Sequence, residues 1–201
     1  MVRIKIIQVI TRLDKGGSSR IALTLSKFLN DQGYLIVIIS GLTKDPQEDL
    51  TRFSKNSGIQ IIFINQLRRS TNLFWDLIIF FRLYYILKKE RPKIVHTHTS
   101  KAGFLGRWAA KLAGVPIIIH MPHGHIFYGY FGKLKTRFFI FLERLTAYIT
   151  DKIITLTERG KVEHLKFAIA KDDKFVSIHN GIELEKYLNF KIDSLAKRKE
   201  F

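Results

Sequence analysis

Residues 2–19 read VRIKIIQVITRLDKGGSS: an apolar strand at 2–10 leads to Gly16, Gly17 and Ser18. Beyond the glycine pair, apolar residues recur at steps of three or four, which predicts a helix from residue 19. Glycine lets a backbone approach a ligand, and a helix start offers unpaired N–H groups at the positive end of its dipole. This turn therefore suits a phosphate or diphosphate, although a tight strand-to-helix turn that binds nothing uses the same residues.

Strand-like and helix-like segments alternate along the rest of the chain. We predict strands at 4–10, 35–40, 59–64, 94–97, 117–121, 153–156 and 175–178, and helices at 19–32, 73–89, 101–113, 133–150 and 158–170. Such alternation is typical of an α/β domain, here a parallel sheet of about seven strands with helices on both faces. Ligands of such sheets bind beyond the carboxyl ends of the strands, which points to the loops at 11–18, 40–46, 97–101 and 122–130.

The charge of the chain is strongly positive. It has 34 Lys and Arg against 17 Asp and Glu, a net charge of +17. This balance favours anionic partners such as nucleic acid, anionic lipid or phosphorylated substrates, and a lysine-rich proteome is the alternative explanation. Because no nucleic-acid-binding motif accompanies the charge, we do not expect nucleic acid as a partner.

The absence of cysteine suits a reducing cytoplasm. The N-terminus lacks a cleavable apolar stretch, and no uncharged apolar run approaches the roughly 18 residues of a membrane span. We therefore expect a cytoplasmic protein, soluble or held peripherally at the inner face of the membrane.

The predicted helix at 133–150 is more apolar than one packing face requires. Its apolar stripe, which we expect to pack on the sheet, comprises Leu134, Phe138, Phe141, Leu145 and Tyr148. Residues off this stripe combine apolar and cationic side chains: Phe131, Lys133, Lys135, Arg137, Phe139 and Ile140. Such a combination is typical of a face that lies on an anionic membrane, and a second domain packed there is the alternative.

Several common nucleotide sites are excluded. No G-x-G-x-x-G follows the first strand, and no Asp or Glu ends the second, so a nicotinamide or flavin dehydrogenase is not expected. A P-loop is absent because the chain contains no G-K-[ST].

Histidines gather at the expected ligand edge of the sheet. His96 and His98 end one strand, and His120, His123 and His125 surround the end of the next. We expect His96 in the core, and His98 and His123 in contact with substrate, since neutral imidazole can bond a sugar hydroxyl or a phosphate. A zinc site is the less favoured alternative because no H-E-x-x-H motif and no cysteine accompany these residues.

Together these segments resemble the N-terminal domain of the group 1, or family 4, retaining glycosyltransferases, which have two Rossmann-like domains in the GT-B fold. The matching stretches are IQVI at 7–10 with GGS at 16–18, IVHTHTSKAG at 94–103, GRWAAKLAGVP at 106–116, HG at 123–124 and NGIE at 180–183. The likeness covers residues 1–187 as a single Rossmann-like domain, and 188–201 are then a charged tail or the start of a linker. The stretch at 96–103 looks most like transferases that build capsular, exopolysaccharide or lipid-linked glycans.

The resemblance implies a nucleotide-sugar donor, a lipid-linked or polysaccharide acceptor, and neither metal nor cofactor. By that likeness Gly16, Gly17 and Ser18 approach the donor diphosphate, and His123 is the catalytic histidine that contacts the transferred sugar. The acceptor side is formed by His98, Thr99, Ser100, Lys101, Gly124 and His125.

In such enzymes a second domain supplies most donor contacts. Residues 1–201 do not provide it, so we expect the chain to be inactive by itself and to need that domain in cis or in trans. The alternative function is a non-catalytic Rossmann-like module that binds a membrane or a partner protein.

Overall fold

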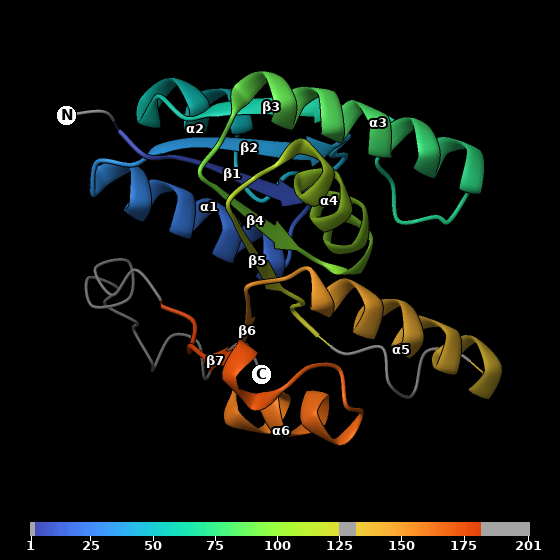
Figure 1. Cartoon of the computed structure of the whole chain (residues 1–201). Coiled ribbons are helices and arrows are strands. Elements are labelled where there is room, and N and C mark those ends of the chain that lie inside the picture. The colour runs from blue at the N-terminus through green and yellow to red at the C-terminus, as the bar shows by residue number, and fades with distance from the viewer. Residues whose placement is uncertain (1–2, 125–131, 182–201) are drawn as a thin grey trace, which may run out of the picture.

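A computed structural model describes residues 3–124 and 132–181 of the chain. It contains a seven-stranded, all-parallel sheet in the order β3-β2-β1-β4-β5-β6-β7, with helices on both faces (Figure 1). The strands are β1 (Lys5–Ile10), β2 (Leu35–Gly41), β3 (Gln60–Ile64), β4 (Ile94–His98), β5 (Ile117–Met121), β6 (Lys152–Thr155) and β7 (Phe175–Ser177). The helices are α1 (Gly17–Asp31), α2 (Leu50–Ser57), α3 (Leu73–Glu90), α4 (Ser100–Ala113), α5 (Lys133–Tyr148) and α6 (Glu158–Lys166).

The predicted fold class and strands are confirmed, and each strand end falls within one residue of its expected position. Helix α2 was not predicted. Of its side chains only Phe53 is buried, so the segment has little apolar periodicity to detect. Its ends are set by caps instead: the Asp49 carboxylate accepts from the N–H groups of Thr51 and Arg52, and Gly58 ends the helix in the left-handed conformation.

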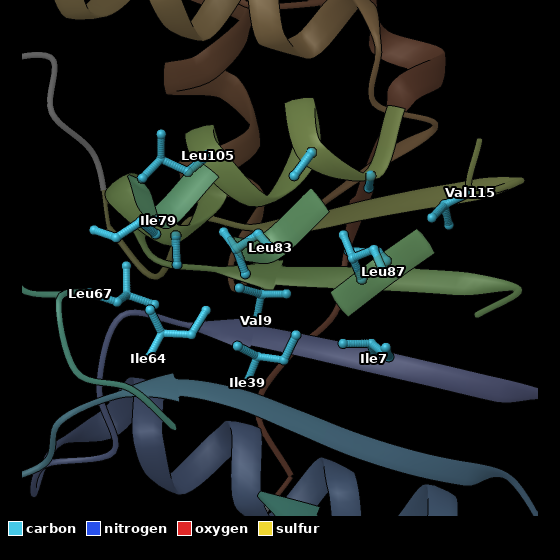
Figure 2. Packing of buried hydrophobic residues seen from close by; sticks show 14 of the residues in the cluster. Ile7, Val9, Ile39, Ile64, Leu67, Ile79, Leu83, Leu87, Leu105 and Val115 are labelled. Carbon is cyan, nitrogen blue, oxygen red and sulfur yellow. The ribbon is translucent and has the colours of Figure 1, made fainter. Parts of the chain in front are cut away.

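Both faces of the central strands are buried. Alternate residues of β1 point to opposite sides, so Ile6 and Ile10 pack with α1 and α2, while Ile7 and Val9 pack with α3 and α4. Figure 2 shows the second cluster, in which Leu83 of α3 lies over Val9. This two-sided burial accounts for the near-continuous apolar runs of the strands.

The packing face of α5 differs from the prediction. Its apolar stripe is exposed, most of all at the two ends, where Leu134 and Tyr148 are 83% and 85% exposed. Ile140, which we expected to face a membrane, is instead buried with Ala147 and Ile153. The predicted assignment of Ile140 is therefore wrong, and so is the expectation that the stripe packs on the sheet.

A buried ion pair explains this orientation of α5. Arg107 of α4 has no exposure to solvent, and its Nη2 donates to both carboxylate oxygens of Glu143 at 2.8 and 2.9 Å. Its other nitrogens donate to the carbonyl oxygen of Gly103 and the hydroxyl of Thr150. A buried guanidinium must keep its acceptors, so α5 turns Glu143 inward and its apolar stripe outward.

No helix within residues 3–124 and 132–181 has both the length and the apolar character needed to cross a bilayer.

We predict that Glu143→Ala lowers the free energy of unfolding by about 3–5 kcal/mol, because it leaves Arg107 buried without its anion. Urea denaturation measures the change. Asp45→Ala is the matched control: its ion pair with Lys15 is about two-thirds exposed, and its loss should cost less than about 1 kcal/mol. Equal effects of the two substitutions would contradict this account of the fold.

Candidate functional site

Three loops meet at the carboxyl ends of β1, β4 and β5. The hydroxyl oxygens of Thr11, after β1, and Thr99, after β4, lie 2.7 Å apart. The N–H of Thr99 donates to the carbonyl oxygen of Met121 at the end of β5. The strand order also reverses at this point, since β1 pairs with β2 on one side and with β4 on the other. Ligand clefts of open α/β sheets form at such a switch point.

The glycine turn forms an open helix N-terminus. Gly16 is the N-cap of α1 with φ 157°, a conformation that favours glycine, and Gly16 and Gly17 are exposed. The N–H of Gly16 is already bonded to Gln47 Oε1 at 2.9 Å. Within the described residues no group accepts from the N–H of Gly17 or Ser18, so both N–H groups are available to an incoming anion.

His98 and His123 form a hydrogen-bonded pair. Nδ1 of His98 lies 2.8 Å from Nε2 of His123, and Nε2 of His98 lies 2.8 Å from Oε1 of Gln8 in β1. His96 is buried as predicted, and its ring lies against that of His98, with centroids 4.2 Å apart and the planes tilted by 39°. His98 is itself fully buried, so the expected direct contact with substrate is not available to it. It supports His123 instead.

Burial keeps the histidine cluster neutral. It lowers the pKa of His96 to about 3 and that of His123 to about 4. The pKa values of His98 and His120 also lie well below the usual value, chiefly because burial penalises the charged ring. Near pH 7 His123 is therefore a neutral ring with one N–H donor and one acceptor nitrogen. No group of three His, Cys, Asp or Glu side chains in the described residues is arranged to hold a metal ion.

Backbone strain gathers at two of the predicted site residues. Thr99 has φ 64° and His123 has φ 58°, both in the left-handed region that non-glycine residues rarely adopt. Such conformations cost roughly 1–3 kcal/mol each and cluster at functional sites. The hydroxyl of Thr99 is also bonded to Thr11 and to the carbonyl oxygen of His98. Thr99 thus joins two strand ends at the site.

His123 and Gly124 line a cavity of about 340 Å³. Most of its other lining residues come from the end of β6 and the first turns of α6, including Thr157, Arg159 and Glu163. The predicted ligand loops omit this segment, although β6 ends at the same edge of the sheet.

A larger hollow of about 770 Å³ lies beyond β2 and β3, but its rim carries Asp45, Glu48 and Asp49, which disfavour a diphosphate.

The remaining predicted acceptor residues have different surroundings. Ser100 is exposed at the start of α4. Lys101 is not free to bind an acceptor as predicted: its Nζ lies 2.5 Å from the Asp76 carboxylate of α3, and its side chain is only 12% exposed. It ties α4 to α3. His125, and Phe131 of the expected membrane face, lie outside the described residues.

The fold and this edge define a Rossmann-like α/β domain of the GT-B type, with an open helix N-terminus and a neutral histidine at the same edge of the sheet. Residues 15–186 match the family model described as Glycosyltransferase Family 4, and the chain belongs to this family.

Two curated proteins and one solved structure are similar to the chain. The chain is 36% identical over 155 residues to the UDP-Gal:alpha-D-GlcNAc-diphosphoundecaprenol alpha-1,3-galactosyltransferase of Escherichia coli, covering 73% of the chain and 40% of that protein. It is 28% identical over 138 residues to the capsular polysaccharide biosynthesis glycosyltransferase CapM of Staphylococcus aureus, covering 64% and 34%. A glycosyltransferase structure from Rickettsia africae is similar with a TM-score of 0.68 at 23% identity, covering 98% of the chain and 49% of that structure. The chain thus spans less than half the length of each.

We predict that stability falls as the pH drops below about 6.5. The folded histidines stay neutral while unfolded ones take up protons, so each histidine with a lowered pKa should cost about 1 kcal/mol of unfolding free energy between pH 7 and 5.5. Urea denaturation at both pH values measures the loss. His96→Phe removes one buried histidine, so it should reduce the loss of unfolding free energy by about 1 kcal/mol. His179→Phe, at an exposed position, is the control and should leave the loss unchanged. A pH-independent stability would contradict the neutral cluster.

Proposed function

We propose that this chain is the N-terminal, acceptor-binding half of a retaining glycosyltransferase, which transfers a sugar from a nucleotide-sugar donor to a lipid-linked or polysaccharide acceptor. The observation that carries the proposal is the His98–His123 pair in a family 4 domain, at the same edge of the sheet as the open N-terminus of α1. The names of the two relatives include a UDP-sugar donor, a diphospholipid-linked acceptor and capsular polysaccharide.

The donor diphosphate is assigned to the start of α1. The N–H groups of Gly17 and Ser18 and the helix dipole supply positive potential where the leaving diphosphate gains charge. No acidic residue stands in the first turn of α1 to oppose it. The arrangement needs neither metal nor cofactor for this task. His123, which follows β5 at the same edge of the sheet, then lies beside the sugar and makes the catalytic contact with it.

A second Rossmann-like domain, in cis or in trans, completes the donor site in this proposal. The need for this second domain is supported by the coverage of the two relatives: the chain matches only 40% and 34% of their lengths. Residues 1–187 are then the acceptor-side domain, and the chain is inactive by itself. Sugar transfer from any nucleotide sugar by the purified chain alone would contradict this part of the proposal.

The exposed face of α5 is proposed to hold the protein at the inner, cytoplasmic face of a membrane. Its apolar stripe lies open to solvent beside the exposed cations Lys133, Lys135 and Arg137, and Phe139 is half-buried. Apolar side chains flanked by cations bind the boundary of an anionic bilayer. The apolar part of the proposed membrane surface is therefore the exposed stripe of α5, and not the buried Ile140 of the sequence-based prediction.

The donor site is tested by titrating the chain with UDP-galactose and UDP. We expect weak binding that Ser18→Asp lowers at least about tenfold, because a carboxylate at the helix start repels the diphosphate but does not harm the helix. Asn56→Asp, an exposed change of the same charge on α2, is the control and should leave affinity unchanged. Equal affinities in all three proteins would contradict the assigned donor site.

The membrane surface is tested by flotation with vesicles rich in phosphatidylglycerol. Each cation near an anionic bilayer contributes about 1 kcal/mol, so Lys135→Glu with Arg137→Glu should weaken binding at least about tenfold. Lys27→Glu with Lys55→Glu, on α1 and α2, makes the same charge change elsewhere and should have a much smaller effect. No flotation of the wild type, or equal loss in both variants, would reject the surface.

A further inference from the structure

A line of hydrogen bonds runs from the core of the sheet to the candidate site. It begins at Gln8 of β1, passes through His98 of β4 and ends at His123 after β5, with 2.8 Å between the nitrogen and oxygen atoms of the first bond and 2.8 Å between the two nitrogens of the second. Gln8 and His98 are both fully buried. Two adjacent strands and the loop after the next strand therefore each contribute one member.

The orientation of the Gln8 amide, with Oε1 facing His98, sets the position of each proton. The Oε1 of Gln8 can only accept, so His98 carries its proton on Nε2. Burial keeps His98 neutral, which leaves its Nδ1 unprotonated and able only to accept. The proton in the second bond must then come from Nε2 of His123.

This proton order leaves His123 with a lone pair on Nδ1. That atom is buried and has no hydrogen-bond partner within the described residues. The same ring lines the cavity between Gly124 and the β6–α6 segment. An unpartnered acceptor next to a cavity is suited to a ligand group that donates a proton, such as a hydroxyl, and not to a phosphate or carboxylate oxygen.

We propose that Gln8, acting through His98, fixes His123 in the Nε2–H tautomer so that Nδ1 accepts a hydrogen bond from a hydroxyl group of the transferred sugar. Gln8 and His98 are positioning residues, because neither touches the substrate. The tautomer is a property of the chain alone. The identity of the hydroxyl donor rests on the proposed function, so the two parts can fail separately.

The tautomers are read by NMR on the 201-residue chain with ¹⁵N-labelled histidine at pH 7, where two-bond proton–nitrogen couplings identify the protonated nitrogen. We expect Nε2–H for both His98 and His123. Gln8→Met, which lacks the amide acceptor, should give a mixture of His123 tautomers. Wild-type His123 protonated on Nδ1, or a Gln8→Met spectrum unchanged from wild type, overturns the proposal. Should Gln8→Met not fold, the wild-type tautomers alone decide.

The ligand is tested in the same spectra. UDP-galactose should shift the Nδ1 resonance of His123, and UDP, which lacks the sugar, should not. A response to both compounds, or to neither, overturns the sugar contact even if the tautomers are as expected. Loss of all UDP binding would in addition remove the support for the proposed function, whereas UDP binding with no sugar effect would affect the assignment of His123 alone.

Discussion

Parallel pairing of β1 with β4, and of β4 with β5, brings Gln8, His98 and His123 close enough to form a line of hydrogen bonds. The order of strands reverses at the same place, so the turn after β1 and the loops after β4 and β5 open on a common side. Thr11 and Thr99 hold two of these loops together through their hydroxyl groups. The start of α1 and the neutral His123 therefore both lie at the carboxyl edge of the sheet.

Much of this arrangement follows from the sequence. Apolar periodicity located the strands, and the rule for parallel sheets placed the glycine turn, Thr99 and His123 at one edge before any contact was known. The resemblance to family 4 rested on several loose motifs in a fixed order, and a family model over residues 15–186 bears it out. These are local or topological properties, which a single sequence carries well.

The sequence did not reveal partners that lie far apart along the chain. Lys101 is engaged by Asp76, and His98 by Gln8, 90 residues away, so both side chains are directed to the interior and not to a ligand. Nothing in the local pattern around His98 indicates such a partner. The same limit explains α5, whose orientation follows from Glu143 and a buried guanidinium on another helix and not from its own apolar spacing.

Two kinds of burial therefore shape the molecule. Apolar side chains fill both faces of the sheet, while polar groups within it are buried only with specific partners. The polar contacts orient α5 toward solvent and His123 toward the cavity. In both cases a buried polar group determines what an exposed surface offers to a ligand.

The central claim is that one edge of this sheet holds a sugar diphosphate, with the glycine turn and His123 as two parts of a single site. A crystal structure of the chain with UDP-galactose tests it most directly. The account predicts the diphosphate at the N–H groups of Gly17 and Ser18, with the galactose beside His123. A diphosphate bound away from the start of α1, or a sugar directed away from His123, would contradict it.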